Sequence, residues 1–587
     1  MTTTIDLRTP RSIADLNNKL GWPASPLLGT AQLQEIYEQA IAQPKGNFFE
    51  NVLKVMGVDW EVSAGTLESI PKEGPLVIVA NHPFGGIDGI VLGAALSKVR
   101  PDCKFLLNYM LNVFPALGEY AIPVDPFGSA PKAANLNSMR QSIHHLKQGR
   151  CLGVFPAGKV SHFHLSQREV LDDEWNSHAA ALAQKTKAKI VPIHFEGRNS
   201  LPFQAAGMVH PRLRTAMLPR EMLNKAGSTV RFSVGRTIGP QIAKRFETSE
   251  SLSHYLRLST YALKGCGKRQ ELKPAEVENP LPIISSIPSE ELRNAVATLP
   301  NESQFLTKGE FTVYCQTGEE LPECILREIG RLREITFREI GEGTGQALDL
   351  DKHDSDYHQL FLWNSETSEI VGAYRLALID KIVEKRGKEG LYSASLFNLQ
   401  KGFLGKLGKT VELGRSFIRP EYQRKHSSLS LIWQGIGQFL QQYPEYQNLF
   451  GCVSLTSDYA PISRDLMVEF LKMKCWDDEL ANLVEARQAP EISPLAESLL
   501  GHMEDSDCSV DAISAVVSSI EEDGKGIPVL LRHYLKLNGT LLNFNVDPSF
   551  NNTTVGLILV RIQDIDPAFR KKFLGLNSVD PSQKQVA

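Results

Sequence analysis

A histidine and an aspartate lie close together in a glycine-rich loop. Residues 76–80 (LVIVA) predict a buried strand, and the loop after it, NHPFGGIDG, contains His82 and Asp88. In open α/β sheets, ligands bind at the carboxyl ends of the strands. Histidine can act as a general base near neutral pH, and a carboxylate on its other ring nitrogen supports the charged form. The pair could therefore deprotonate a hydroxyl that attacks a thioester, although most such pairs are structural hydrogen bonds.

Three further blocks follow this loop in order: residues 122–126 (IPVDP), 155–161 (FPAGKVS) and 191–193 (VPI). Together the four blocks resemble those of the glycerolipid O-acyltransferases, the lysophosphatidic-acid acyltransferase-like superfamily. The resemblance implies that His82 is the base and Asp88 its partner. It also implies that residues of the third block contribute to substrate binding, namely Phe155, Pro156, Gly158, Lys159 and Ser161.

The departures from this family concern the acceptor. Here five residues separate the histidine from the aspartate instead of four, and the glycines of the loop could absorb the extra one. Members that use a glycerol phosphate carry an arginine in the second block and Glu-Gly-Thr-Arg in the third, and guanidinium groups bind phosphate through paired hydrogen bonds. Pro126, Ala157 and Val160 stand at three of those places. The acceptor is therefore expected to lack a phosphate. The segments HPFGGIDG and FPAGKVS resemble the subgroup of this family whose acceptors are lyso-aminolipids. Lys159 could meet a carboxylate of the acceptor, unless this lysine is simply solvated.

Two more features accompany the third block. Backbone N–H groups around Gly158 could form an oxyanion site. His162 and His164 could suggest a metal, but no third ligand stands at a suitable spacing, so ordinary strand or loop histidines and no metal are predicted.

A second group of charged and aromatic residues follows in the other half of the chain: Arg333, Phe337, Asp351, Asp354, Arg375, Glu412, Arg415 and Ser416. Their spacings, with Arg-x3-Phe, Asp-x2-Asp and Glu-x2-Arg, resemble the branch of the GNAT fold that contains autoinducer synthases and ornithine N-acyltransferases. Three segments resemble the ornithine enzymes more than the autoinducer synthases. They are residues 370–376 (IVGAYRL), 411–418 (VELGRSFI) and 526–560.

The resemblance implies an N-acylation in which an ammonium must lose a proton before it attacks a thioester. Glu412 is predicted to accept that proton, with Arg415 holding it. The two aspartates of the group could bind the second ammonium of an ornithine-like substrate, while Arg333 or Arg375 meets its carboxylate. The alternative is that these charges form a structural network over the site.

The resemblance implies that the acyl donor is an acyl carrier protein, and the sequence weakens the case for coenzyme A. GNAT enzymes that use coenzyme A bind its pyrophosphate on a loop with two glycines, and residues 423–428 (QRKHSS) lack both. Arg419, Arg424 and Lys425 could dock the acidic carrier protein, or form a solvated loop. No bound cofactor is expected.

Periodic apolar runs predict two unrelated α/β domains, at residues 1–265 with an N-terminal helical extension and at residues 305–587. Residues 266–304, rich in proline and serine, are predicted to be a linker. In the first domain the predicted strands are 76–80, 152–155, 190–195 and 230–234, and the predicted helices 131–149 and 174–188. In the second the predicted strands are 311–316, 358–364, 370–378, 410–418, 449–455 and 554–562, and the predicted helices 321–339 and 429–443.

Composition restricts the location and the partners. Lys+Arg is 63 against Asp+Glu 67, which disfavours nucleic-acid binding. The eight cysteines form no CxxC pair, which is typical of reduced thiols in the cytoplasm.

Residues 105–122 could lie at an interface, or form a buried helix and strand, but could not cross a bilayer. The arginines between residues 198 and 220 could rest on anionic lipid headgroups or form a solvated face. A cytoplasmic protein at the inner face of the membrane is expected.

The two resemblances together imply the two-step synthesis of an ornithine lipid. The second domain would move a 3-hydroxyacyl chain from acyl carrier protein to ornithine, and the first would acylate the free hydroxyl of the lyso-lipid. One alternative is the same chemistry on glycine, lysine, glutamine or a serine-glycine dipeptide. The others are a binding or regulatory protein with one decayed acyltransferase domain, and an autoinducer synthase.

Overall fold

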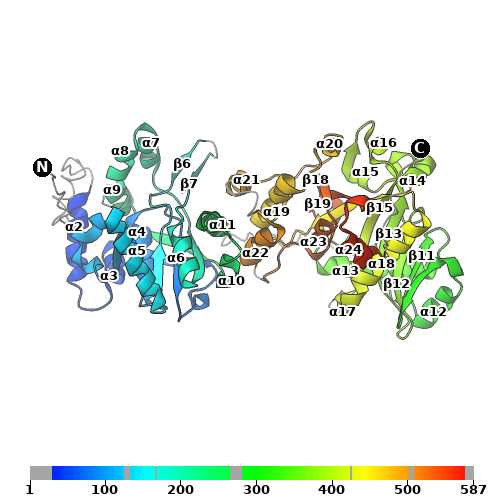
Figure 1. Ribbon diagram of the computed structural model, residues 1–587, viewed down its shortest axis with the longest axis horizontal. Coiled ribbons are helices and arrows are strands. Elements are labelled where there is room, and N and C mark those ends of the chain that lie inside the picture. The colour runs from blue at the N-terminus through cyan, green and yellow to red at the C-terminus, as the bar shows by residue number, and fades with distance from the viewer. Residues whose placement is uncertain are drawn as a thin grey trace. The chain divides into compact units, whose positions relative to one another are not determined.

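The computed structural model divides the chain into two compact units (Figure 1). The structure describes residues 29–124, 132–165, 168–264, 280–423, 426–501, 508–521 and 523–575. One unit holds the described residues up to 264 together with those of 494–526, and the other holds the remainder. Both have helices packed around a mixed sheet, so the predicted α/β class is confirmed.

The first unit is built on a seven-stranded sheet in the order β1-β9-β8-β2-β5-β3-β4. Its strands are β1 (Asp59–Ala64), β2 (Leu76–Ala80), β3 (Lys104–Asn108), β4 (Ala121–Val124), β5 (Cys151–Val154), β8 (Lys189–Phe195) and β9 (Thr229–Val234). Neighbouring strands are parallel except for β8 and β9. Because β2 and β5 are parallel and in register from Leu76 to Val79, the residues that follow them emerge at the same edge. That edge carries His82 and Phe155.

The helices of this unit cover both faces of the sheet. They are α2 (Thr30–Ile41), α3 (Phe48–Met56), α4 (Gly86–Ser97), α5 (Lys132–Lys147), α6 (His178–Thr186), α7 (Leu201–Val209), α8 (Pro211–Ala216), α9 (Leu218–Leu223), α10 (Pro240–Ala243), α11 (Ser249–Tyr261), α21 (Pro494–Leu500) and α22 (Val510–Ile520). Leu76, Ile78 and Ala80 share a core with α3 and α4. The alternate residues of β2 point to the opposite face, against which α6 and α11 pack. A small hairpin, β6 (His162–His164) and β7 (Glu169–Leu171), follows the third block.

Residues 105–122 differ from the predicted helix and strand. They form β3, two 3-10 turns (Tyr109–Val113 and Pro115–Leu117) and β4. Pro115 begins the second turn, a position where its missing N–H costs nothing. Across the part of the chain that the structure describes, no helix has both the length and the apolar character needed to cross a membrane.

The second unit is built on an eight-stranded sheet in the order β10-β11-β12-β13-β15-β16-β19-β18. Its strands are β10 (Gln304–Lys308), β11 (Phe311–Thr317), β12 (His358–Asn364), β13 (Glu369–Leu378), β15 (Thr410–Ile418), β16 (Asn448–Leu455), β18 (Thr540–Asp547) and β19 (Thr553–Arg561). All neighbours are antiparallel except β15 and β16, which pair only from Thr410 to Leu413. Beyond Leu413 these two strands separate, a feature that shapes the second site.

Helices cover both faces of this sheet as well. They are α12 (Ser289–Ala297), α13 (Glu323–Glu339), α14 (Ile379–Arg386), α15 (Ser393–Leu396), α16 (Phe403–Leu407), α17 (Pro420–Gln423), α18 (His426–Gln442), α19 (Pro461–Lys474), α20 (Asp478–Ala481), α23 (Val529–Lys536) and α24 (Pro567–Leu574). Two short strands, β14 (Phe397–Leu399) and β17 (Val484–Ala486), pair beside it. The helix α13 packs on Phe361 and Trp363, while Gly435 of α18 lies against Leu360. Since neighbouring strand residues point to opposite faces, these two helices cover opposite faces.

The predicted linker is partly wrong. Leu292 and Val296, one helical turn apart on α12, are buried in a core of the second unit. The preceding segment is tied to that unit as well, since Leu281 donates its backbone N–H to the carbonyl of Gly345 at 2.8 Å. Proline and serine gave this stretch the composition of a linker and concealed its short apolar stripe. The second domain also differs from its predicted span, because the described residues of 494–526 belong to the first unit.

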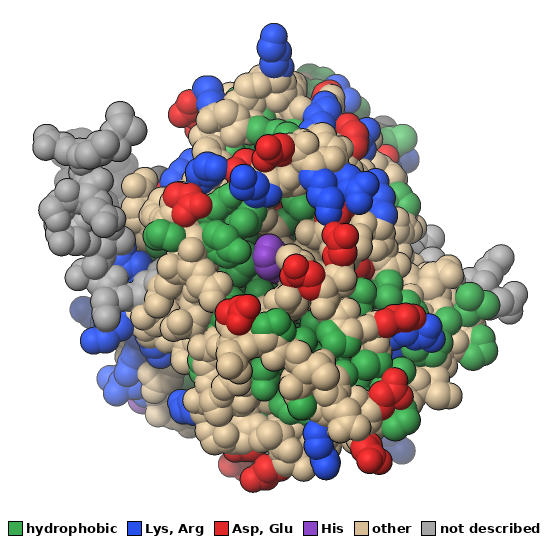
Figure 2. All heavy atoms as spheres, turned by 90° about the vertical axis from the view of Figure 1, so that its right-hand side faces the viewer, with side chains coloured by type: hydrophobic (Ala, Val, Ile, Leu, Met, Phe, Trp, Pro, Cys, Tyr) green, Lys and Arg blue, Asp and Glu red, His purple; other side chains and the backbone are tan. Residues whose placement is uncertain are grey.

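The surface charge is mixed. Figure 2 shows one face of the molecule, on which basic and acidic side chains are interspersed among apolar and neutral ones. This pattern agrees with the near balance of 63 basic and 67 acidic residues.

Candidate functional site

His82 and Asp88 lie together at the carboxyl edge of the first sheet. Nδ1 of His82 is 3.0 Å from Oδ2 of Asp88, and 19% of the His82 side chain is exposed while that of Asp88 is buried. The extra residue of the loop is absorbed at Gly85, whose φ of 92° favours glycine. The backbone N–H groups of Phe84 and Gly85 donate to the same carboxylate oxygen at 2.9 and 3.0 Å. The carboxylate is thus fixed beside the histidine ring, where its charge can support the protonated imidazole of a general base.

A buried carboxylate that the sequence did not reveal, Asp172, joins the first block to the third. Its Oδ1 accepts the backbone N–H of His82 at 3.2 Å and the hydroxyl of Ser161 at 2.5 Å, and its Oδ2 accepts the indole N–H of Trp175 at 2.9 Å. The backbone N–H of Ser161 donates to the carbonyl of His82 at 2.9 Å. Burial raises the pKa of Asp172, and these donors oppose the rise. Asp172 therefore positions the loop that carries the histidine.

The other residues of the third block surround this pair. The Phe155 ring lies 4.3 Å from the His82 ring, and the carbonyl of Pro156 accepts the backbone N–H of Asn176 at 3.1 Å. The N–H of Gly158 donates to the Phe155 carbonyl at 3.0 Å within a turn, so this one N–H group is not free for the oxyanion site suggested around Gly158. Val160 is buried, whereas Pro126 lies outside the described residues.

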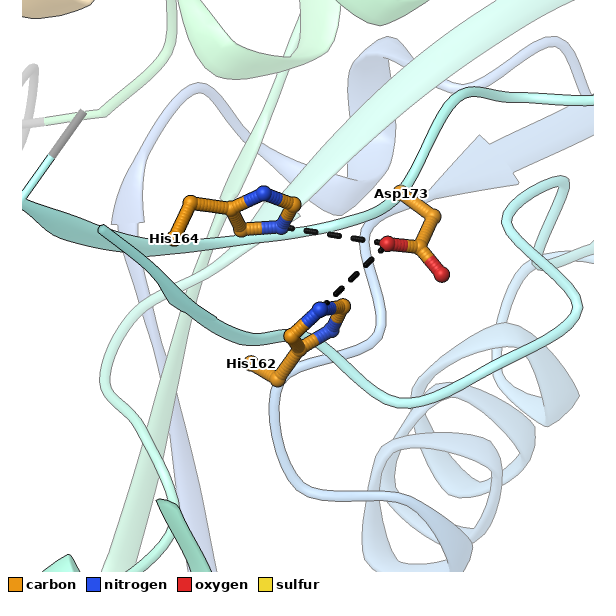
Figure 3. Close-up of side chains that lie close together, drawn as sticks. All are labelled: His162, His164 and Asp173. Carbon is orange, nitrogen blue, oxygen red and sulfur yellow. Dashed lines mark ion pairs between the residues drawn. The ribbon is translucent and has the colours of Figure 1, made fainter. Parts of the chain in front are cut away.

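The two histidines after the third block do have a third neighbour. Nε2 of His162 and Nε2 of His164 lie 3.5 and 3.9 Å from Oδ1 of Asp173. Dashed lines mark these two ion pairs in Figure 3. Burial, followed by the charge of Arg214, lowers the pKa of His162 to about 4. Nζ of Lys159 lies 3.7 Å from the other oxygen of Asp173. The sequence hid this arrangement because Asp173 lies beyond the second strand of the hairpin.

In the second unit, the predicted arginines and aspartates form a buried network with one another. Arg333 lies 3.1 Å from Asp354, and Arg375 lies 2.7 Å from Asp351 and 3.3 Å from Asp354. Burial opposes the ionisation of Asp354, but Arg333 and Arg375 outweigh it and hold the pKa of its carboxyl well below the ordinary value. The two aspartates were predicted to bind the second ammonium of the substrate, and Arg333 or Arg375 its carboxylate. Because these side chains are paired with one another, the structure gives those roles no support. The geometry favours the alternative, a structural network.

Arg415 and Ser416 occupy a β-bulge opposite Tyr374, which turns the arginine side chain out of the regular register. The guanidinium of Arg415 lies 3.3 Å from Asp349 and 3.4 Å from Asp351, and it stacks on the Phe550 ring at 4.2 Å. Phe337 meets the same ring edge-on at 5.7 Å. The prediction that Arg415 holds Glu412 is therefore wrong, because its guanidinium is paired with the two aspartates.

Glu412 is buried and its carboxylate is engaged by other donors. Its Oε2 accepts the hydroxyl of Tyr357 and the backbone N–H of Tyr392, the latter at 3.2 Å, and its Oε1 accepts the backbone N–H of Ser393 at 2.8 Å. Each oxygen thus has a donor, which is the pattern of a carboxylate that fixes a loop.

Comparisons with known proteins match both units of the chain. Residues 30–267 match the family described as acyltransferase, and residues 332–434 match the acetyltransferase (GNAT) domain. The chain is 31% identical over 297 residues to the glycine N(alpha)-acyltransferase of Phocaeicola vulgatus, covering 48% of this chain and 89% of that one. It is 30% identical over 217 residues to the lyso-glycine lipid O-acyltransferase of the same organism, covering 35% and 74%. The chain belongs to the acyltransferases.

A third relative of this acyltransferase is the L-ornithine N(alpha)-acyltransferase of Brucella abortus, 28% identical over 248 residues, which cover 39% of this chain and 78% of the relative. The predicted pairing of an acyltransferase domain with a GNAT domain is thus confirmed.

One buried carboxyl group near the second site of the acyltransferase, that of Glu342, has an oxygen without a hydrogen-bond partner among the described residues. Glu342 follows α13, and only 4% of it is exposed. Oε1 is buried and has no hydrogen-bond partner among the described residues, while a side-chain hydrogen bond joins the carboxyl to Ser454. Ser454 is on β16 beyond Gly451, the last residue that pairs with β15, where the two strands have separated. Burial raises the pKa of Glu342 to about 7, and the hydrogen bond to Ser454 and the charge of Arg415 limit the rise. A buried carboxyl that titrates near neutrality can exchange protons there.

The residues predicted to dock a carrier protein are only partly described. Arg419 lies 3.2 Å from Glu369 and 3.4 Å from Glu421, so its charge is matched within the unit. Arg424 and Lys425 lie outside the described residues.

The buried network predicts a large stability difference between two arginine variants. Arg375→Met removes the partner of two carboxylates and should destabilise the second unit by about 3–5 kcal/mol, because a buried charge is left uncompensated. Arg327→Met removes an exposed pair with Glu323 at 3.6 Å and should cost less than about 1 kcal/mol. Urea unfolding of the full chain measures the loss of stability in each variant. An equally small loss of stability in Arg375→Met and Arg327→Met would contradict the buried charge network.

Proposed function

We propose that this acyltransferase makes a phosphorus-free aminolipid in two steps. The second unit transfers a 3-hydroxyacyl chain to the α-amine of ornithine, and the first unit acylates the free hydroxyl of that product. The proposal rests chiefly on one observation: a single chain has relatives named for amino-acid N-acylation and for lyso-lipid O-acylation. Joining both steps in one chain raises the effective concentration of an amphiphilic intermediate.

In the first unit, His82 is the proposed base. Its Nδ1 faces Asp88, which leaves Nε2 to take the proton of the lyso-lipid hydroxyl. The alkoxide oxygen bonds to the thioester carbonyl carbon, the carbon–sulfur bond breaks, and the proton passes from the imidazolium to the departing thiolate. Asp88 stabilises the imidazolium in between. Asp172 acts through the backbone of His82 and is a positioning residue.

In the second unit, we assign the proton acceptor to Glu342 instead of Glu412. Glu412 has a donor on each oxygen, whereas Oε1 of Glu342 has none among the described residues and lies near the separated strands. Glu342 takes a proton from the ornithine ammonium, the amine nitrogen bonds to the carbonyl carbon, and the carbon–sulfur bond breaks. The thiolate leaves with the proton that the tetrahedral intermediate loses. Unpaired backbone groups of separated strands can hold an extended ligand, which suits the pantetheine arm of the donor.

The identities of the acceptor and of the acyl donor rest on less direct observations. Val160 and Ala157 leave the third block without a phosphate-binding arginine or its glutamate, which agrees with an aminolipid acceptor. Glycine is the second candidate amino acid, because two relatives are named for glycine and its lipid. Acyl carrier protein is the proposed donor, since residues 423–428 lack the glycines of a pyrophosphate loop.

We further propose that the first unit rests on the inner face of the cytoplasmic membrane through α7 and α8. Leu201, Met208, Val209 and Leu213 are exposed on these helices, while Phe203 is buried beneath them. An exposed apolar group of this kind is typical of a lipid or protein contact, and a lipid substrate favours the former. Arg220, on the next helix, could meet anionic headgroups.

Lipid mass spectrometry tests the two steps together. Expressed in a host without aminolipids, the wild-type chain should yield a diacylated amino acid without phosphorus. His82→Ala should accumulate the mono-acylated form, because only the second step loses its base. The matched control His178→Ala changes an exposed histidine of the same unit and should behave as wild type. Unchanged lipids in the His82 variant would contradict the proposal.

The pH dependence of N-acylation tests Glu342. Its carboxylate form increases as pH rises through about 7, so kcat/KM for the amino acid should rise over that range. Glu342→Gln should lower the rate at least about a hundredfold, the usual size of a general-base effect, and remove this titration. The control Glu339→Gln, exposed at the end of α13, should leave rate and profile unchanged. An unaltered profile in Glu342→Gln would show that another group is the base.

Vesicle sedimentation tests the membrane face. The full chain should bind vesicles with anionic lipids, and replacing Leu201, Met208 and Leu213 by serine should weaken binding several-fold, because apolar area leaves the bilayer boundary. The control Val529→Ser removes an exposed apolar side chain of the second unit and should have no effect. Equal binding by all three proteins would refute this face.

A further inference from the structure

His162, His164 and Asp173 form a cluster that the proposed reactions do not use. Both histidines are on β6, two residues apart, so their rings share one side of the hairpin and stack with centroids 4.4 Å apart. Asp173 follows β7, and its carboxylate points between the two rings (Figure 3). One ligand atom from each residue lies within 4.8 Å of the others.

The distances within the cluster are too long for hydrogen bonds. Nitrogen–oxygen hydrogen bonds are about 2.7–3.2 Å long, whereas Oδ1 of Asp173 is 3.5 and 3.9 Å from the two Nε2 atoms. In a tetrahedral zinc site with bonds of about 2.0–2.2 Å, the ligand atoms lie about 3.3–3.6 Å apart. Nε2 of His164 is buried and has no hydrogen-bond partner among the described residues. Nε2 of His162 and Nε2 of His164 thus both face Oδ1 of Asp173 at close to the separation of zinc ligands, without a hydrogen bond between them.

We propose that these three side chains bind a zinc ion. Two imidazoles and one carboxylate are a donor set that zinc accepts, and magnesium or calcium would require more oxygen ligands. The fourth position would be open to water. The ion would join β6 to the segment after β7, directly beside Asp172, and would thereby brace the hairpin that contacts the His82 loop.

Two neighbouring cationic side chains, Lys159 and Arg214, influence the expected affinity for zinc. Nζ of Lys159 lies 3.7 Å from Oδ2 of Asp173, and its side chain is 57% exposed, so it can turn into solvent when an ion binds. The charge of Arg214 also acts on the cluster. Both charges repel a dication, so removing one should tighten the binding of zinc. A site for an anion would respond in the opposite direction.

Titration calorimetry of the purified full chain, freed of metal, tests the proposal with zinc as the probe. The wild type should bind one zinc ion, His162→Ala with His164→Ala should lose that binding, and Lys159→Ala should strengthen it. The exposed His178→Ala is the matched control and should bind as wild type. Zinc should also raise the unfolding temperature of the wild type but not of the double variant.

Cobalt(II) provides a readout that does not depend on the variants folding alike. In the wild type it should give the strong visible absorption of a tetrahedral site with nitrogen and oxygen donors. The proposal is overturned by an octahedral spectrum, by zinc binding that survives in the double variant, or by weaker zinc binding in Lys159→Ala.

Discussion

A carboxylate that is taken out of water must find donors or cations, and this constraint organises both halves of the acyltransferase. In the first unit, Asp88 accepts two backbone N–H groups beside His82, and Asp172 ties the backbone of His82 to Ser161. In the second unit, Asp354 lies between Arg333 and Arg375. Buried carboxylates thus hold the loops at the ends of the strands.

Two groups that this rule leaves incompletely satisfied are among those to which we assign function. Glu342 is buried with one unpartnered oxygen, near strands that have separated, and burial keeps its pKa near neutrality. In the cluster around Asp173, two histidines face the carboxylate at distances beyond hydrogen bonding. Incomplete satisfaction is costly in a folded protein, and in our proposals a substrate completes the partners of Glu342 and an ion those of the histidine cluster.

The sequence predicts the features that depend on local order. Alternating and continuous apolar runs place most strands of both sheets, and the short His82 loop brings its own aspartate within reach. The sequence does not predict which side chains from distant segments meet in the fold. Asp172 and Asp173 reach the third block across a hairpin, and Glu342 meets Ser454 from a distant strand. Arg415 stands three residues from Glu412, but the β-bulge turns it to Asp349 and Asp351. Composition misleads at residues 289–297, where two buried apolar side chains outweigh the surrounding prolines and serines.

The central claim is that one chain N-acylates an amino acid and then O-acylates the hydroxyl of the attached 3-hydroxyacyl chain. Its most direct test is reconstitution with purified protein, 3-hydroxyacyl and acyl thioesters of acyl carrier protein, and equal concentrations of ornithine, glycine, lysine and glutamine. Mass spectrometry of the products should show a diacylated amino acid, with ornithine preferred. A product with a single acyl chain, or no N-acylated amino acid from any of the four, would contradict the account.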